Sequence, residues 1–143
     1  MGTDIRCVAE KKVGSSWESV LDDLFEMYRD YHITAWLGDL HNYRHINPIV
    51  PLRDLPADRS DRFDCILHDS GSFAEGWVTV EELNQVDYDQ PLEQHVSQNA
   101  VAYSKSYTEA PAGTLREYLG EYYFQELARL NASGAERILF FFY

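Results

Sequence analysis

The sequence predicts an α+β domain: a small mixed or antiparallel sheet that contains both the N- and C-terminal strands, with helices packed on one face. Three observations indicate this fold. Apolar and charged residues alternate over residues 4–12, residues 136–143 form a nearly unbroken apolar and aromatic run, and helical apolar patterns fill the chain between them. The chain has 143 residues, which fits a single domain spanning 1–143.

The first strand is expected at residues 4–12, and the turn-forming letters VGSS follow it. Two structures remain open for residues 17–27. The letters WESV could return as a second strand and close a hairpin. Apolar residues at helical spacing, together with a capping-box pattern of Ser15 and Glu18, favour a helix over the same residues.

Three shorter helices are expected in the middle of the chain. The letters YHITAWLGDL, residues 31–40, carry an apolar stripe. The stretch GDLHNYRHINPIVPLRDLPAD contains three prolines, so the helix cannot continue through it. A second helix is expected at 59–67. After an extended Trp77, the capping box of Thr79 and Glu82 opens a third.

The last third of the chain predicts a long helix followed by a buried strand. Thr114 and Glu117 form another capping box, and apolar residues recur at helical spacing to about Asn131. Gly134 is expected to end this helix. The closing letters ERILFFFY lack polar alternation, which is typical of a strand buried on both faces in the middle of a sheet.

The composition is strongly acidic. There are 24 aspartates and glutamates against 12 lysines and arginines, a net charge of −12 at pH 7. Such a field repels phosphate backbones, so direct nucleic-acid binding is not expected, whereas a basic protein surface would be attracted. No apolar run approaches the ~18 residues of a membrane span, and the first residues do not look like a signal peptide. We therefore expect a cytoplasmic protein without membrane contact.

The two cysteines, Cys7 and Cys65, are isolated in the sequence. Because there is no CxxC pair, zinc-ribbon and thioredoxin-like sites are not expected. Both thiols are expected to be reduced and buried, since a free cysteine behaves as a small hydrophobic residue.

The stretch 38–58 contains the best candidates for metal ligands. His41 and His45 have the i, i+4 spacing of zinc sites, with Asp39 beside them. No HExxH motif is present, however, and a metal needs three or four ligands. Distant residues such as His68 and Asp69 would have to complete the set. We therefore expect a connection held by hydrogen bonds, with no metal and no cofactor.

Other catalytic signatures are missing as well. The letters HDSGS place His, Asp and Ser together, but triad partners come from distant elements, and no GxSxG or glycine-rich phosphate loop is present. Arg53, Arg59 and Arg62 lie among aspartates, and we expect them to form intramolecular ion pairs. The alternative is a small metal- or nucleotide-binding enzyme with a pocket in this region. Its candidate residues are Asp39, His41, His45, Arg53 and His68.

The segment 75–93 is the candidate docking surface. It holds six acidic residues and no lysine or arginine, a pattern typical of either a solvated face or a surface that binds a basic partner. The six are Glu75, Glu81, Glu82, Asp87, Asp89 and Glu93. Tyrosines are enriched in protein interfaces. Those expected to contribute here are Tyr103, Tyr107 and Tyr123, the last because it falls outside the apolar stripe of its helix.

Five short segments together resemble a family of small uncharacterised phage and prophage proteins. In chain order they are MGTDIR, YHITAWLGDLHN, PLRDLPAD, GWVTVEEL and ERILFFFY. They are similar to the family's Met-Gly-Cys-Asp-Ile-His signature, its helix, its Pro-rich loop, its Trp-Leu-Thr-x-x-Glu-Leu segment and its apolar final strand. Thr3 and Arg6 stand where the signature has cysteine and histidine, so of that cluster Asp4 alone remains. The resemblance implies a phage or prophage origin and no particular activity.

Two functions are therefore considered. The first is a phage-type binding protein that inhibits a basic, nucleic-acid-handling host defence factor, in the manner of an anti-CRISPR protein. Acidic side chains would occupy the surface that normally binds phosphates, which would be a form of nucleic-acid mimicry. The second is the small enzyme with the pocket described above. The first is favoured because no ligand set or catalytic motif is complete.

Overall fold

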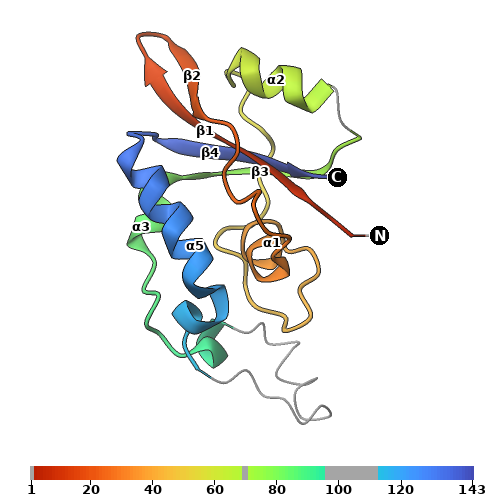
Figure 1. Ribbon diagram of the computed structural model, residues 1–143, viewed down its shortest axis with the longest axis vertical. Helices are drawn as coiled ribbons and strands as arrows, with labels where there is room; N and C mark the ends of the chain where they lie inside the picture. Colours follow the sequence, from red (N-terminus) through yellow and green to blue (C-terminus); the bar gives the residue numbers. More distant parts are fainter. Residues whose placement is uncertain (1, 69–70, 96–112) are drawn as a thin grey trace.

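The computed structural model describes residues 2–68, 71–95 and 113–143, which fold around one four-stranded antiparallel sheet (Figure 1). The strand order is β2-β1-β4-β3, so the N- and C-terminal strands both lie in the sheet, which confirms the predicted α+β class. The elements in chain order are β1 (Ile5–Val13), β2 (Ser16–Leu21), α1 (Tyr31–Gly38), α2 (Asp61–His68), β3 (Phe73–Thr79), α3 (Val80–Gln85), the 3-10 helix η1 (Leu92–His95), α5 (Leu115–Ala132) and β4 (Arg137–Phe142).

Strand β4 lies inside the sheet, as its apolar letters predicted. All of its residues are buried. Strands β1 and β3 pair with its two edges, with Cys7 opposite Phe140 and Val78 opposite Ile138. Because neither face of β4 meets solvent, its sequence has no need of polar alternation.

The first part of segment 17–27, left open by the sequence, is a strand. β2 returns beside β1 through a two-residue turn, and Gly14 has a positive φ of 64° at the first turn position, where two-residue hairpins favour glycine. Residues 22–30 contain no helix, so the helical alternative for 17–27 is wrong. The apolar spacing that suggested it includes Leu24 and Phe25, which are buried in the core.

Helices pack on the sheet in two layers. Helices α1, α3 and α5 cover one face of the sheet, as predicted. The main core lies on this face and includes Trp36, Phe140 and Phe142. Helix α2 departs from the prediction, because it lies on the opposite face (Figure 1). Its Phe63 packs against Phe141 with ring centroids 5.9 Å apart, in a second and smaller cluster.

The helix ends follow the predicted capping patterns. At α3, the Thr79 hydroxyl accepts a hydrogen bond from the Glu82 N–H, and the Glu82 carboxylate accepts one from the Thr79 N–H. Thr114 caps α5 as predicted. Helix α5 is interrupted at Gly120, which has a non-helical φ of 83°, and Gly134 follows its end with a φ of 76°. Among the residues that the structure describes, no helix is both long and apolar enough to cross a membrane.

One ion pair is buried between the sheet and α2. Glu10 is fully buried, and its Oε1 lies 2.8 Å from Nε of Arg137. The other oxygen of Glu10 accepts a 2.7 Å hydrogen bond from the Ser60 N–H. The Arg137 guanidinium also contacts Asp58 at 3.1 Å and stacks 3.7 Å from the ring centroid of Trp17. These contacts tie β1 and β4 to the start of α2.

The two cysteines differ in their surroundings. Cys7 is buried in β1 as predicted, and this burial raises the pKa of its thiol. Cys65 is exposed on α2, so the prediction that both are buried is wrong for this residue. Phe63 is the buried residue of α2. Cys65 lies two positions later, so its side chain points to nearly the opposite side of the helix, towards solvent.

Candidate functional site

The histidine-bearing stretch after α1 is held in place by hydrogen bonds and ring stacking. His41 stacks on Tyr31, with ring centroids 4.2 Å apart, and its Nε2 lies 2.8 Å from Oγ1 of Thr3. The Asn42 side chain donates a hydrogen bond to the Ile46 carbonyl and accepts one from the Ile46 N–H. His45 is exposed, with a positive φ of 53°. The stretch is a pinned connection, as expected from its sequence.

The five residues of the alternative pocket do not come together in one cavity. Asp39 ends α1 in a left-handed conformation. Arg53 lies beside β3, where it donates hydrogen bonds to Glu82 and to the Trp77 carbonyl. His68 is exposed at the end of α2, on the other face of the sheet. Within residues 2–68, 71–95 and 113–143, no group of three or more His, Cys, Asp or Glu could hold a metal ion.

Arginine ion pairs are spread over the whole described surface. The predicted pairs of the 53–62 segment are present, since Arg53, Arg59 and Arg62 each contact a carboxylate within 2.8 Å. In the described part of the chain, eight arginines form such pairs: Arg6, Arg29, Arg53, Arg59, Arg62, Arg116, Arg129 and Arg137. The net negative charge therefore resides in the acidic residues that lack an arginine beside them.

Of the six acidic residues predicted to form a docking surface, two are ion-paired. Glu82 pairs with Arg53 at 2.8 Å and also closes the α3 capping box. Asp89 pairs with Arg116 at 2.8 Å, and the hydrogen bond from this guanidinium lowers the pKa of Asp89. Glu75 lies apart from the others on β3 and is exposed. The remaining three are exposed as well: Glu81, Asp87 and Glu93.

The fold brings a second acidic segment beside the first. The Arg116 N–H donates to the Tyr88 carbonyl at 2.7 Å, and the Leu92 N–H donates to the Gly113 carbonyl at 2.9 Å. The start of α5 therefore lies along the connection between α3 and η1. We call the combined surface the acidic ridge. It consists of the exposed residues Glu81, Asp87, Asp89, Glu93, Glu117 and Glu121.

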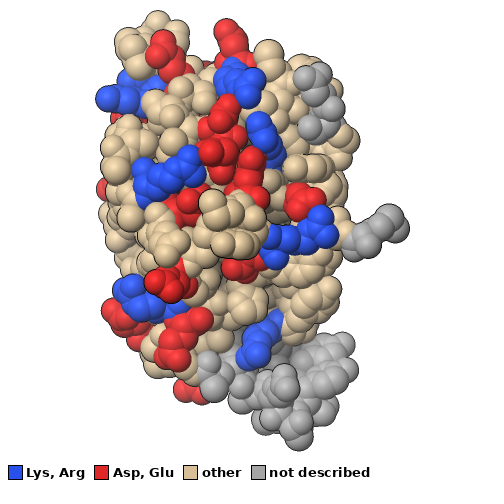
Figure 2. Space-filling model, viewed as in Figure 1, with Lys and Arg blue, Asp and Glu red and all other residues tan. Residues whose placement is uncertain are grey.

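The acidic ridge concentrates negative charge at one end of the molecule. Residues 80–95 and 113–122 contain seven acidic residues and, as lysine or arginine, Arg116, so their net charge is 1 − 7 = −6. In the lower left of Figure 2, near the start of α5, acidic side chains gather around one basic side chain. Higher on the same face, basic and acidic side chains alternate. The charge distribution is therefore uneven, and the ridge is its acidic part.

The tyrosine prediction is wrong for Tyr123. This side chain is fully buried, accepts a 3.1 Å hydrogen bond from the Trp36 indole and lies 2.7 Å from the Tyr88 hydroxyl. Burial raises the pKa of Tyr123, and it raises that of Tyr88 to about 12. The other two predicted tyrosines, Tyr103 and Tyr107, lie outside the described residues.

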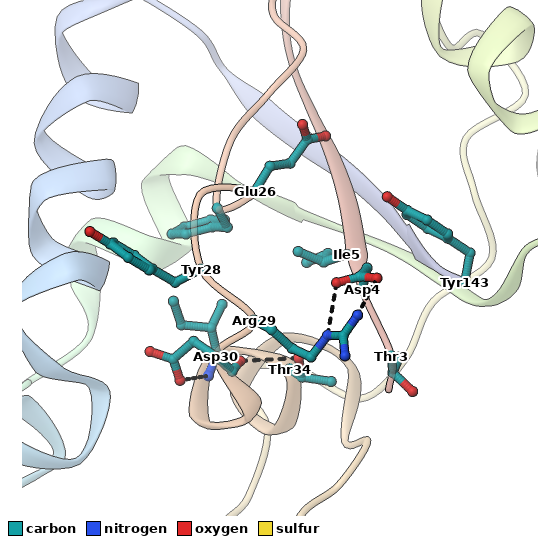
Figure 3. A pocket seen from close by; sticks show the side chains of 11 residues that line it. Thr3, Asp4, Ile5, Glu26, Tyr28, Arg29, Asp30, Thr34 and Tyr143 are labelled. Atoms are coloured by element: carbon teal, nitrogen blue, oxygen red, sulfur yellow. Dashed lines mark hydrogen bonds and ion pairs between the residues drawn. The ribbon is translucent and has the colours of Figure 1, made fainter. Parts of the chain in front are cut away.

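A cavity of about 100 Å³ opens between β1, the connection before α1 and Tyr143 (Figure 3). The Arg29 guanidinium and the Asp4 carboxylate face each other there, at 2.8 and 3.0 Å, and the hydrogen bond from Arg29 lowers the pKa of Asp4. Glu26 points away from them and pairs with Arg6 at 2.9 Å. Burial raises the pKa of Glu26. Asp4 and Glu26 are each paired with an arginine, and the third carboxylate of the lining, Asp30, caps the start of α1. The volume of the cavity suits a few water molecules rather than a substrate.

Comparison of the chain with protein-family models, curated proteins and solved structures finds no significant match. The functional argument therefore depends on the surface itself. Sequence reasoning missed Glu117 and Glu121 as members of the ridge, because they lie more than twenty residues after segment 75–93. No local sequence signal joins them to that segment, and Gly120 interrupts the helix between them.

Proposed function

We propose that this protein is a non-enzymatic binding protein whose acidic ridge docks on a basic surface of a nucleic-acid-handling protein and blocks that surface. The observation that supports this is the ridge itself, six exposed acidic residues on two segments that backbone hydrogen bonds hold side by side. In line with the resemblance to phage and prophage proteins, the target is a host defence factor, such as a CRISPR effector, in the cytoplasm of a bacterial host.

The physical basis is the contrast between the ridge and the rest of the described surface. Elsewhere, arginines sit against carboxylates and cancel their charge within a few ångströms. In the ridge, Arg116 is outnumbered by acidic residues, and its ion pair among the described residues is with Asp89. Such a surface attracts basic clefts from a distance and raises the rate of encounter. Once docked, its carboxylates take the place of phosphates.

The proposal is contact through one surface rather than imitation of a nucleic acid by the whole molecule. Basic side chains interrupt the acidic ones over the upper part of the face in Figure 2. A double helix presents phosphates at regular intervals without such interruptions. Docking through the ridge needs only a local match of charge.

A pair of matched double variants tests this function. Glu93→Lys with Glu121→Lys reverses charge in the ridge, and Asp54→Lys with Glu75→Lys makes the same change at exposed positions outside it. The target is first captured with the wild-type protein from phage-infected or lysogenic bacteria, identified by mass spectrometry and purified. Association is then measured at about 50 and about 200 mM salt. Circular dichroism confirms that both variants are folded.

We expect the ridge variant to associate about tenfold more slowly or worse, with a weaker dependence on salt, and the control variant to change by less than about twofold. Wild-type protein should also displace a labelled oligonucleotide from the target. If both variants slowed association equally, the ridge would not be the docking surface. A target that holds this protein and its nucleic acid at the same time would refute the blocking function.

A further inference from the structure

The outer edge of β2 leaves backbone hydrogen-bonding groups unused. In an antiparallel hairpin with a two-residue turn, the pair nearest the turn is hydrogen-bonded, and bonded and non-bonded pairs then alternate. Val13 and Ser16 flank the turn. It follows that Trp17 and Ser19 occupy the non-bonded positions, so their N–H and carbonyl groups point outward. No hydrogen bond within the described residues reaches these outward groups.

The opposite edge of the sheet is covered. Arg53 donates two hydrogen bonds, of 2.9 and 3.2 Å, to the outward carbonyl of Trp77 in β3. Proteins commonly protect their edge strands in this way, because an open edge recruits other strands. β2 is thus the open edge in the described part of the sheet.

A groove of about 430 Å³ runs beside this open edge, between β2 and the start of α2. It is lined on the strand side by Trp17, Glu18 and Ser19, two of which carry the outward backbone groups. The other side is formed by Asp22, Ser60, Asp61 and Arg62. Arg62 pairs with Asp22 at 2.8 Å, which leaves the exposed Asp61 carboxylate as the unpaired charge of the groove lining. The exposed Glu18 side chain lies on the other face of β2, where Lys11 is its neighbour on β1.

We infer that the β2 edge binds an extended, basic segment of a partner protein, which adds to the sheet as a fifth strand. Its backbone would pair with Trp17 and Ser19, and one of its lysines or arginines would lie opposite Glu18. Alternate side chains on the other side of that strand would enter the groove beside Asp61. Figure 1 places β2 and η1 at opposite ends of the molecule, so this site is separate from the acidic ridge.

A second copy of this chain is a poorer occupant of the same edge. Antiparallel pairing of β2 with itself would bring together the exposed Glu18 carboxylates of two copies on one face and their Asp61 carboxylates on the other. Like charges opposite each other on neighbouring strands are destabilising, and each copy carries a net charge of −12. The charge of the groove therefore selects a basic segment.

The first test uses a fluorescein-labelled peptide of about eight residues in which lysine and threonine alternate. The control peptide has glutamate in place of each lysine. Fluorescence anisotropy should show saturable binding of the lysine peptide, weakened by salt, and none of the glutamate peptide. In hydrogen exchange read residue by residue, the peptide should protect the amides of Trp17 and Ser19. The amide of Glu18 already faces β1 and should not change.

Two variants locate the site. Ser19→Pro removes an outward N–H without removing a bond to β1, and proline is tolerated on edge strands. We expect it to weaken peptide binding about tenfold. Glu18→Lys with Asp61→Lys should weaken the lysine peptide by a similar factor and allow the glutamate peptide to bind. The double variant Asp54→Lys with Glu75→Lys again serves as the control, with less than about twofold change.

The inference is overturned if the lysine peptide does not bind, if it binds without protecting Trp17 and Ser19, or if the control variant loses as much affinity as the groove variant. Protection of the same two amides without peptide, together with a doubled mass in analytical ultracentrifugation, would instead show that a second copy occupies the edge. Failure of these tests leaves the acidic ridge untouched, since none of the substitutions lies in it.

Discussion

Replacement of Arg137 by methionine tests how the sheet and α2 are held together. In the folded protein, the Glu10 carboxylate is fully buried and has two partners, Arg137 at 2.8 Å and the Ser60 N–H at 2.7 Å. Arg137→Met leaves a buried charge with one neutral donor, which costs about 3–5 kcal/mol. The whole domain is expected to be stable by roughly 5–15 kcal/mol, so the variant should lose a large share of its free energy of unfolding.

Replacement of Glu10, the other member of this ion pair, should cost less stability. In Glu10→Gln, the amide oxygen can still accept from Ser60, and Arg137 keeps Asp58 at 3.1 Å, so we expect a loss of about 1–3 kcal/mol. In the double variant Glu10→Gln with Arg137→Met, neither charge remains. Its loss should be smaller than the sum of the two single losses, because no uncompensated buried carboxylate is left.

Urea unfolding followed by tryptophan fluorescence measures these differences, provided that the dependence on urea keeps the same slope in each variant. An Arg137→Met loss below about 1 kcal/mol would refute the reasoning, because an uncompensated buried carboxylate cannot cost so little. Strict additivity in the double variant would refute it as well, since directly coupled groups are not additive.

Three further predictions follow from single side chains. Gly38→Ala places a Cβ in steric conflict with the Phe142 ring, so we expect a loss of about 1–3 kcal/mol; an unchanged melting temperature would contradict this contact. Thr79→Ala removes the cap of α3 and should cost about 1 kcal/mol in urea unfolding, whereas Thr79→Ser should restore most of it. Burial raises the pKa of Glu26, so its protonation favours the folded state: this contribution is full below the unfolded pKa near 4.5 and is lost as pH rises through the folded pKa. Stability measured against pH should lose this component in Glu26→Gln, and a profile identical to that of the wild type would show that Glu26 does not titrate in this way.

The sequence predicts those parts of the fold whose signals are local. The Thr79 and Glu82 capping box involves two residues three positions apart, and β4 is recognisable from its own letters. Segment 17–27 fails for the opposite reason. Phe25 has a positive φ of 63°, and its N–H donates to the Glu126 carboxylate 101 residues away, so a tertiary contact decides its conformation. The apolar spacing of segment 17–27 contains no information about the contact with Glu126.

The candidate site, too, is predictable only where its sequence signals are local. The acidity of segment 75–93 is visible in the sequence, but its extension by Glu117 and Glu121 depends on backbone hydrogen bonds between distant segments. Tyr123 was predicted outside the apolar stripe because the helix was assumed to be continuous. Gly120 interrupts that helix and so changes the direction in which later residues point, and Tyr123 turns into the core. The sequence signal that could have shown this was the glycine itself.

The two proposed surfaces would contribute differently to binding. The acidic ridge offers charge on helices and the connections between them, so it mainly accelerates encounter and responds to salt. The β2 edge offers fixed backbone groups and a groove that side chains can enter, so it selects an extended strand and determines how long the complex lasts. A partner that used both would show a fast, salt-sensitive association that ridge variants slow, and a dissociation rate that Ser19→Pro increases. If one set of substitutions changed both rates equally, the two surfaces would not be acting separately, and a single contact site would have to account for binding.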